Sequence, residues 1–474
     1  MTSPNISFDK IPSSIRKPGK YFEFNTKLAV RTLPGNPQLV VLIGQRLAAG
    51  SVSATTLVNV FSDQQAGDYF GHGSQLHLMA RAAIKANPYL QLSAIALDDA
   101  AGSVAASGSL ALAGTATAGG SFAIKIGNAD PIAVAVSVGD TAAVVATAIN
   151  TALASLVDLP VAAAVNAGTV TLTAKNKGSQ GNLIPVTILQ NVAGIVPTVT
   201  AMSAGATDPV LSSALTAIFP AGHNIVCSGL NDQVSLTALR THLASVGSPM
   251  EQRDALGVYA TTGTLGAAST LAGLINDGFT TTAFLRATRS LPCELAAAYA
   301  AVIASEEDPA RPLNTLELVG IDVPDASQWL GRTEQENLLY NGVTPIEIGP
   351  GQKVQIVRAI TTYLVDPQGV QDPSMLDVTT PRTLFYMRKA YRQRIALRFP
   401  REKLSGRTAP KVRSELLDVS YKAEELEIIE NVDQWKDYLL VERDSQDVSR
   451  LNAKIPTDVV NGFHIFAGRL DLIL

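Results

Sequence analysis

The residues best able to do chemistry in this chain lie in the segment Gly71-His72-Gly73-Ser74, which brings an imidazole and a hydroxyl close together. Such a pair could supply a general base and a nucleophile. We interpret the segment instead as a glycine-rich turn in which Ser74 caps the helix that follows. His77 follows His72 by five residues, which does not place two ligands on one helical face, and no Cys or carboxylate set accompanies them. The sequence therefore predicts neither a catalytic pair nor a metal site here.

Motifs of other enzyme classes are also missing. The segment Gly349-Pro350-Gly351-Gln352-Lys353 lacks the length and the Ser/Thr of a phosphate-binding loop. No G-x-G-x-x-G follows the first expected strand, and no G-x-S-x-G occurs. Cys227 falls in an apolar strand, where a thiol is a small core residue rather than a nucleophile. We predict no catalytic residue and no cofactor, and an α/β enzyme with an unrecognised active site remains the alternative.

The composition favours a large protein that associates with copies of itself. A chain of 474 residues predicts about three domains. Hydrophobic residues make up 46% and charged residues only 16%, so much of the surface is expected to be covered by neighbouring subunits. The net charge of −4 excludes an overall binder of polyanions.

Several features predict a protein that is soluble and intracellular when made. Cys227 and Cys293 are the only cysteines and lie far apart in sequence, which argues against a disulfide framework. No window reaches the roughly 18 apolar residues of a membrane span. The first twenty residues carry prolines and charges where a signal peptide needs an apolar core.

Strands and helices alternate through the middle of the chain, which predicts a mostly parallel sheet covered on both faces. The expected strands are residues 39–44, 91–97, 224–227, 255–260 and 280–285. The expected helices are residues 74–86, 234–246, 266–276 and 292–305. Because the alternation stops near residue 98 and resumes later, we expect one discontinuous α/β middle domain made of residues 28–97 and 207–343.

Residues 98–206, here called the inserted module, interrupt this alternation and are rich in Ala, Gly, Thr and Val. One helix fits residues 141–156, with Asp140 or Thr141 as its N-cap. Short strands are expected at residues 109–112, 122–126, 132–138, 169–174 and 185–189. We interpret the segment as a small, mostly β domain placed in a loop of the middle domain, which is tolerated when the two insertion points are close.

Residues 344–453 are expected to form a separate α+β domain with an uneven charge distribution. Residues 382–413 contain eleven Lys or Arg against one acid, whereas residues 415–447 contain eleven acids against three bases. The expected strands are residues 353–361, 438–442 and 451–455, and the expected helices are residues 383–399 and 414–429.

The basic helix at residues 383–399 leaves Arg388, Lys389 and Arg392 off its apolar stripe. One interpretation is a solvated face neutralised by the acidic helix that follows, with its acids at residues 424–427. The other is a docking face for an acidic partner surface. Nucleic acid is disfavoured, because no aromatic platform or known motif accompanies the basic residues and the chain is acidic overall.

Both ends of the chain contain short apolar segments that a monomer would leave unpaired. Prolines confine residues 1–27 to an extended arm or edge strand, with a frayed terminus as the alternative. Residues 454–474 end in an apolar strand, and an unpaired edge invites pairing with another chain. The side chains expected in these inter-subunit strands are Ile6, Phe8, Tyr21, Phe22 and Phe24 in the N-terminal arm and Ile465, Phe466, Leu470, Leu472 and Leu474 in the C-terminal arm.

Several segments together resemble the contractile tail sheath proteins of Mu-like bacteriophages. At the N-terminus the similar segments are Ile6-Ser7-Phe8-Asp9-Lys10-Ile11-Pro12 and Arg16-Lys17-Pro18-Gly19-Lys20-Tyr21. Towards the C-terminus they are Arg394-Ile395-Ala396-Leu397-Arg398-Phe399-Pro400, Glu430-Asn431-Val432-Asp433, Leu440-Val441-Glu442-Arg443-Asp444 and Ile455-Pro456-Thr457-Asp458-Val459-Val460-Asn461. These are architectural rather than catalytic signatures, and their order along the chain makes the resemblance specific.

The resemblance implies a structural subunit of a virion tail, assembled in the bacterial cytoplasm. Such subunits form a helical or stacked-ring homo-oligomer around a tail tube protein, bounded by baseplate and tail terminator proteins, with no nucleic acid and no membrane insertion. The resemblance also implies that residues 344–453 line the inside of the sheath, with Arg388, Lys389 and Arg392 as candidate tube-facing residues. The inserted module would then face solvent, and the arms would complete sheets in neighbouring subunits.

Overall fold

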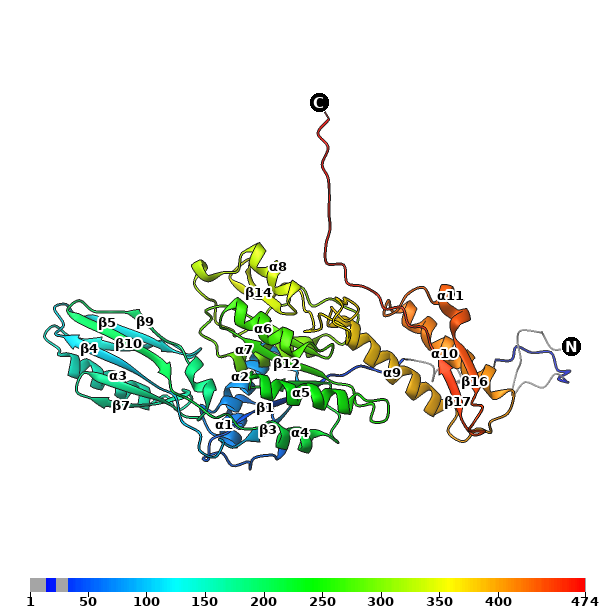
Figure 1. Cartoon of the computed structure of the whole chain (residues 1–474), viewed down its shortest axis with the longest axis horizontal. Coiled ribbons are helices and arrows are strands. Elements are labelled where there is room, and N and C mark those ends of the chain that lie inside the picture. Colours follow the sequence, from blue (N-terminus) through cyan, green and yellow to red (C-terminus); the bar gives the residue numbers. More distant parts are fainter. Residues whose placement is uncertain (1–13, 23–32, 474) are drawn as a thin grey trace. The chain divides into compact units, whose positions relative to one another are not determined.

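The computed structural model describes residues 14–22 and 33–473 of the chain, which form two compact units. The central unit comprises residues 36–386 together with residues 459–473. The C-terminal unit comprises residues 387–458 together with the described residues up to position 35. Figure 1 labels the helices and strands of both units.

The central unit is built on an eight-stranded sheet with the order β15-β14-β13-β12-β11-β1-β3-β2. All pairings from β14 to β3 are parallel, and β2 and β15 join the two ends antiparallel. The strands are β1 (Leu39–Gln45), β2 (Leu57–Asn59), β3 (Gln91–Leu97), β11 (Ile225–Ser228), β12 (Leu256–Thr261), β13 (Thr280–Phe284), β14 (Thr344–Gly349) and β15 (Lys353–Ile356).

Helices cover both faces of this sheet, as the continuous apolar runs of the strands predict. Val40 and Leu42 of β1 belong to the core that includes α2 and α7, whereas Val41 and Ile43 pack in the core that includes α4 and α5. The helices of the central unit, the inserted module apart, are α1 (Asp63–Phe70), α2 (Gln75–Ala86), α4 (Ser212–Ile218), α5 (Gln233–Val246), α6 (Leu265–Ile275), α7 (Pro292–Ser305) and α8 (Arg332–Tyr340), with a short 3₁₀ turn at Ala326–Gln328.

The two edges of the central sheet are short or covered. β2 has only three residues. The outer edge of β15 is bonded to the preceding loop, because Thr315 N–H donates to the Ile356 carbonyl and Leu318 N–H donates to the Val354 carbonyl, both at 2.8 Å. Covered and short edges protect a sheet from pairing with other chains.

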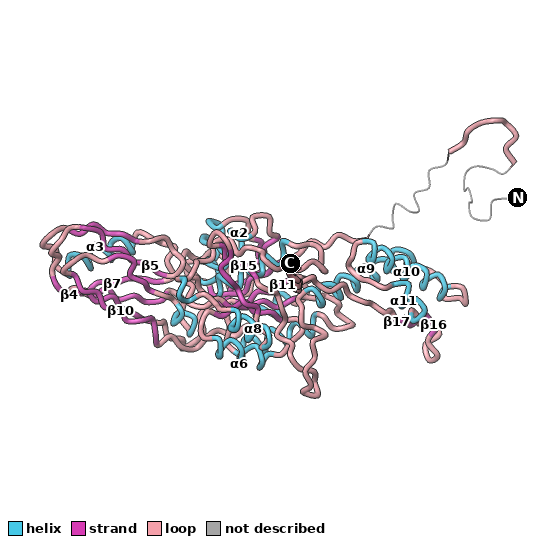
Figure 2. The backbone as a smooth tube through the Cα atoms, turned by 90° about the horizontal axis from the view of Figure 1, so that it is seen from above, coloured by secondary structure: helices cyan, strands magenta, loops and turns pink. Residues whose placement is uncertain are grey.

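The inserted module leaves the central unit after β3 and returns before α4. A bridge between Val104 and Ala206 joins its two connecting segments, so the insertion points are close, as expected. Its strands form a four-stranded sheet (β10-β4-β8-β7) and a three-stranded sheet (β6-β5-β9), and Figure 2 shows them as a group distinct from β11 and β15. The elements are β4 (Ser107–Gly114), β5 (Gly120–Ile126), β6 (Ile132–Val136), α3 (Ala142–Ala154), β7 (Val161–Asn166), β8 (Thr169–Ala174), a 3₁₀ turn (Ser179–Leu183), β9 (Val186–Gln190) and β10 (Ile195–Ser203).

The C-terminal unit combines helices with one small sheet. Helix α9 (Thr379–Arg398) continues into this unit and is followed by α10 (Thr408–Glu425), α11 (Val432–Trp435) and a 3₁₀ turn at Lys436–Tyr438. The antiparallel strands β16 (Leu440–Arg443) and β17 (Leu451–Lys454) complete it. Among the described residues, no helix is long and apolar enough to cross a membrane.

The structure corrects three expectations about the C-terminal third of the chain. The strand expected at residues 353–361 ends at Ile356 and belongs to the central sheet through β14, which the sequence did not predict. Helix α10 begins at Thr408 and ends at Glu425, several residues earlier at each end than expected. The terminal strand expected to complete the C-terminal domain is not formed within the described chain, because residues 460–473 have no strand and the only bridge from position 455 to position 473 is at residue 459. Its pairing with a neighbouring subunit stays a prediction.

Candidate functional site

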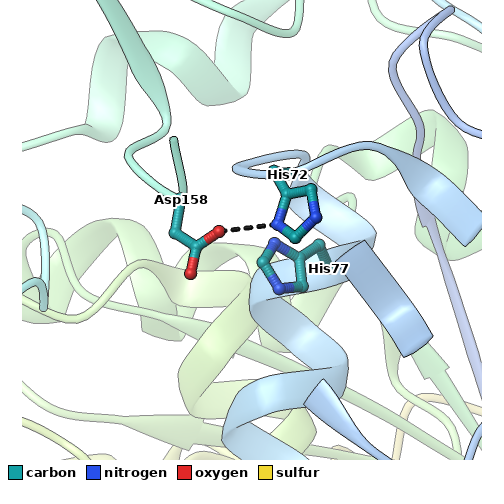
Figure 3. Close-up of side chains that lie close together, drawn as sticks. All are labelled: His72, His77 and Asp158. Carbon is teal, nitrogen blue, oxygen red and sulfur yellow. Dashed lines mark hydrogen bonds and ion pairs between the residues drawn. The ribbon is translucent and has the colours of Figure 1, made fainter. Parts of the chain in front are cut away.

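A polar cluster lies at the start of α2, and Figure 3 shows three of its members, His72, His77 and Asp158. Nδ1 of His72 lies 2.7 Å from Oδ1 of Asp158, which belongs to the inserted module. Nη2 of Arg81 donates to the other oxygen of Asp158 at 2.5 Å. On α1, Oδ1 of Asp63 lies 3.0 Å from Nε2 of His77 and accepts from Nε of Arg81 at 3.0 Å. One arginine therefore bridges two carboxylates from different parts of the central unit.

The cluster has the spacing of a metal site, but its hydrogen bonds assign the histidine another role. Ligand atoms of His72, His77 and Asp158 all lie within 4.8 Å of one another. Nδ1 of His77 accepts from the Gly73 N–H at 3.0 Å, which leaves the ring proton on Nε2. Burial, and next the Arg81 guanidinium 3.3 Å away, lower the pKa of His77. A neutral ring with both nitrogens engaged is a structural link rather than a metal ligand.

This cluster connects the inserted module to the rest of the central unit through the contacts of Asp158 with His72 and Arg81. Burial would raise the pKa of Asp158, but its bonds to His72 and Arg81 outweigh burial and lower the pKa, so the carboxylate stays charged. Nearby, Nζ of Lys175 donates to the backbone carbonyls of Val157 at 2.6 Å and of His72 at 3.2 Å. The prediction that Ser74 caps the following helix is confirmed, because its hydroxyl accepts from the His77 N–H.

The inserted module also contributes side chains to the crevice at the end of β1. In parallel sheets, ligands bind beyond the carboxyl ends of strands where the chain order reverses, and β1 lies at such a point between β3 and β11. Here the Gln45 amide donates to Asp99 at 2.8 Å and to the Lys177 carbonyl at 2.7 Å. Oδ1 of Asn176 accepts from the N–H of Gln75, the first residue of α2, at 2.9 Å. Gln45, Gln75 and Asn176, which line the cavity at this place, thus have protein hydrogen-bond partners where an α/β enzyme would hold a phosphate or substrate.

Cys227 is buried in β11 with no exposed surface, which confirms its prediction as a core residue. Burial raises the pKa of its thiol, so the reactive thiolate is disfavoured. Cys293 lies at the start of α7 and is also buried, with a raised pKa of the same origin. Neither thiol has the environment of a nucleophile.

Part of the basic helix is neutralised within the C-terminal unit. Arg394 is only 4% exposed and donates to Glu415 at 3.1 Å and to Asp418 at 2.5 Å. Arg398 donates to the same Glu415 at 3.3 Å. These acids come from the middle of α10, not from residues 424–427 as the sequence had suggested. The interpretation of an internally neutralised helix therefore holds for this half of α9.

The three candidate tube-facing residues lie earlier on α9. Arg388 and Arg392 are exposed, and each makes a further polar interaction. Lys389 is partly buried, and its Nζ donates to the Gly35 carbonyl at 2.9 Å. Burial lowers the pKa of Lys389. A role for these residues in docking stays a prediction.

The described part of the N-terminal arm is exposed. Tyr21 is 43% and Phe22 is 89% exposed, and neither belongs to a strand. The Tyr21 hydroxyl donates to the Lys17 carbonyl at 3.1 Å. The other expected arm residues of this end, Ile6, Phe8 and Phe24, lie outside the described residues, as does Leu474 at the other end.

The C-terminal arm presents its apolar side chains to solvent. The exposed fractions are 79% for Ile465, 83% for Phe466, 100% for Leu470 and 86% for Leu472. Figure 1 shows this end of the chain as an extended trace. The expected strand is absent from the isolated chain because a strand needs a partner for its backbone groups, and these residues have none among the described residues.

The β16–β17 sheet offers edges for such a partner. It has two strands of four residues, and no third strand of the described chain pairs with either. Leu440 pairs with Lys454, and Asp444 N–H donates to the Arg450 carbonyl at the turn end, so Val441 and Ala453 lie at positions whose backbone groups point outwards. Isolated two-stranded hairpins are marginally stable, which favours completion by further strands.

Sequence reasoning missed the partners in the polar cluster. Asp158 is 86 residues from His72 in sequence, and no spacing rule connects them. Arg81 could have been noticed, because it follows His77 by four residues and so lies on the same face of the helix.

Comparisons with known proteins identify the family. Residues 204–362 match the family described as "Phage tail sheath protein central domain", and residues 370–473 match "Phage tail sheath C-terminal domain". The Mu-like prophage FluMu tail sheath protein of Haemophilus influenzae is 35% identical over 491 residues, covering 99% of this chain and 100% of that protein.

Solved structures show the same fold at low sequence identity. The sheath tail protein of Desulfitobacterium hafniense gives a TM-score of 0.52 at 10% identity, over 94% of this chain and 97% of that one. The sheath tail protein of Listeria innocua gives 0.51 at 14% identity, over 91% and 94%. The sheath complex of an extracellular contractile injection system in its contracted state gives 0.50 at 11% identity, over 98% and 99%.

The described chain has a multidomain α/β fold with several sheets and an exposed C-terminal segment that carries apolar side chains, and this architecture is that of the solved sheath proteins. The chain belongs to the phage tail sheath protein family, and it is a structural subunit of a contractile tail sheath.

Proposed function

We propose that this subunit polymerises around a tail tube through strands exchanged between neighbours, and that contraction of the resulting sheath drives the tube through the host envelope. The subunits form a helical or stacked-ring homo-oligomer. The baseplate and the tail terminator bound it, and it is assembled in the bacterial cytoplasm. Residues 344–453 face the tube, and the inserted module faces solvent.

The observation that carries the proposal is the match between an open sheet and an unpaired strand in the same chain. The β16–β17 sheet has outer edges that pair with no described strand, and residues 465–473 are extended, exposed and rich in apolar side chains. Phe466, Leu470 and Leu472 fall on one face of an extended chain, opposite Arg469 and Asp471. Such alternation suits a strand that covers a core with one face and meets solvent with the other.

Linking subunits through strands permits a heterologous contact that does not close on itself, which is the geometry of a filament. Main-chain hydrogen bonds supply the affinity, and pockets for alternate side chains supply the register. The side chains of Tyr21 and Phe22 in the N-terminal arm are also exposed. We assign this arm to a second strand exchanged between subunits. Two links per subunit would keep a mesh connected while subunits tilt and slide.

A contact with the tube must be releasable, and exposed charges suit that requirement. Arg388 and Arg392 are exposed on α9, before the internally paired Arg394. Exposed charge pairs are weak and are screened by salt, so they can be exchanged for larger contacts between subunits during contraction.

A catalytic role is the alternative, and the structure of the crevice at β1 speaks against it. Gln45, Asp99 and Asn176 are bonded to one another or to backbone groups at the place where a parallel sheet would bind a ligand. We therefore assign the chain no enzymatic activity and no cofactor. As a further part of the proposal, we assign it no bound nucleic acid and no membrane insertion.

Deletion of residues 465–474 tests the proposed assembly. We expect the shortened protein to fold, with unchanged circular dichroism, because no described residue of this segment is buried. Under conditions in which the full-length protein forms hollow tubes by negative-stain microscopy, the shortened protein should stay monomeric. Tubes of normal length from the shortened protein would contradict strand exchange by this arm.

A further inference from the structure

One residue of the exposed terminal segment is held firmly against the central unit. The side chain of His464 is only 12% exposed, whereas its neighbours Phe463 and Ile465 are each 79% exposed. The segment Val459–Leu474 belongs to the central unit by its contacts, although the residues before it belong to the other unit. The chain is thus attached at His464 and without buried residues from position 465 to position 473.

The binding place of His464 is built from the loops around β15 and α9. Nδ1 of the ring accepts from Nδ2 of Asn314 at 2.9 Å. Nε2 lies 3.5 Å from Oδ1 of Asp377, and Arg358 holds that carboxylate through two bonds of 2.8 Å each. Burial lowers the pKa of His464, the Asp377 carboxylate opposes this, and Arg358 adds to it.

Gly462, two residues before His464, allows the chain to pass close to the His464 ring. A Cβ on Gly462 would lie 2.5 Å from Nε2 of His464 and 2.8 Å from Cγ of Pro312, closer than side-chain carbons pack. The chain therefore passes between Pro312 and the ring with no space for a side chain. Together, Pro312, Asn314 and Asp377 form a socket around the ring of His464, in which Nδ1 has a hydrogen-bond partner and Nε2 has none among the described residues.

We propose that this socket is the anchor of the C-terminal arm, with His464 as the positioning residue that limits the exchanged segment to residues 465–474. This inference rests on the proposed strand exchange. An extended chain spans at most about 3.3–3.6 Å per residue, so the anchored segment reaches roughly 33–36 Å. Released from the socket, residues 459–474 would reach roughly 53–58 Å. The socket thus sets both the length and the starting point of the link to the neighbour.

Anchoring also raises the effective concentration of the strand at the neighbouring sheet. A linker whose length matches its span gives the highest effective concentration, and longer linkers lower it. The unanchored segment also loses its fixed direction. We therefore expect loss of the anchor to weaken assembly without abolishing it, in contrast to deletion of the strand itself.

Substitution of the ring and of its partner tests the anchor in the full-length protein. In the monomer, His464→Ala and Asn314→Ala should each raise amide hydrogen exchange of residues 459–464 about tenfold or more. Both should raise the critical concentration for tube formation roughly three- to tenfold. His464→Asn keeps an acceptor near the position of Nδ1 and should restore both values toward wild type. Phe463→Ala, in the same segment but exposed, is the control for exchange.

The outcomes separate the anchor from the proposed function. Unchanged exchange in both the His464→Ala and the Asn314→Ala monomers would overturn the anchor, because exchange is measured without any neighbour. Raised exchange with an unchanged critical concentration would also overturn it, since the socket would then have no effect on assembly. Failure of strand exchange itself would show instead as normal tubes after deletion of residues 465–474, a result that does not involve the socket.

Discussion

The central sheet and the β16–β17 sheet differ in how their edges end. The central sheet stops at β2, which has three residues, and at β15, whose outer edge is bonded to residues 315–318. The small sheet stops at two four-residue strands, and no other described strand pairs with them. The protein therefore protects the edges of the sheet that makes its core and leaves open the sheet that we assign to assembly.

This difference separates folding stability, which depends on the central sheet, from assembly, which we assign to the small sheet and the C-terminal arm. The central sheet has helices on both faces and a polar cluster that joins the inserted module to it, so its contacts are satisfied within one chain. The outer edges of the small sheet and the C-terminal arm pair with no described strand, and the arm exposes apolar side chains. Changes in the first region should alter unfolding, whereas changes in the second should alter polymerisation.

The largest expected effect comes from blocking an open edge. Val441→Pro removes a backbone N–H that points away from β17 and leaves the bonds between β16 and β17 in place. We expect it to abolish tubes in negative-stain images while thermal unfolding of the monomer changes little. Val441→Thr keeps the N–H and is the control. If Val441→Pro assembles normally, the neighbour's strand does not add to this edge, and Ala453→Pro then examines the opposite one.

The second-largest expected effect is on the folding stability of the central unit. Arg81→Met removes the cation between Asp63 and Asp158 and should lower the free energy of unfolding by about 2 kcal/mol. Chemical denaturation followed by circular dichroism measures this value, and tubes should still form. Lys85→Met, on the exposed face one turn later, is the control and should change stability little. Loss of tubes with unchanged stability would reverse the assignment of roles to the two regions.

A smaller effect is expected at the tube. Arg388→Glu combined with Arg392→Glu should weaken binding of the sheath to tail tubes about tenfold, or roughly 1.4 kcal/mol, at low salt. Co-sedimentation with tubes at increasing ionic strength measures this, and the difference from wild type should shrink as salt rises. Assembly of tube-free sheath should be unaffected. Equal loss with and without tubes would refute docking by this face.

The smallest expected effect is on the pH dependence of folding stability in the central unit. His242 packs edge-on against Phe219, with ring centroids 6.0 Å apart, and burial lowers its pKa from 6.5 to about 4. Because the unfolded chain takes up the proton first, this stability is complete above about pH 6.5 and is lost as the pH falls toward 4. Allowing for partial exposure, the loss is about 1 kcal/mol.

Melting temperatures between pH 7.5 and pH 4.5 measure this acid sensitivity. His242→Phe keeps the aromatic packing without the titrating group, so its melting temperature should fall less over the same range. An identical fall for wild type and variant would show that other groups cause it.

The alternation of strands and helices could be predicted from the sequence because the buried strands are continuous apolar runs. The run at β1 and the helix with Pro292 at its start were placed within one residue of their observed bounds. The elements that were missed, such as β14 and α8, have mixed polarity and depend on contacts with distant segments. Thr344 and Pro345 of β14 find their partners on β13, about 60 residues earlier, which no local pattern indicates.

The candidate surfaces were less predictable than the fold. The apolar character of Phe466, Leu470 and Leu472 is plain in the sequence, and the structure of the single chain leaves these side chains exposed. Their role between subunits stays a prediction. Their state as a strand could not be read from one chain, since the partner belongs to another molecule. The socket of His464 was also hidden, because Asn314 and Asp377 are 150 and 87 residues away and meet it only through the fold.

The bridge between Val104 and Ala206 makes the inserted module a place where another domain could be substituted. Paired residues of antiparallel strands lie about 4.5–5.5 Å apart, so the chain leaves the central unit and returns to it at nearly one point. A foreign domain whose own ends lie that close could replace the inserted module without lengthening any strand of the central sheet. If the inserted module faces solvent in the sheath, as we propose, the Val104–Ala206 bridge would be an attachment point for displaying many copies of an antigen or enzyme along a tube.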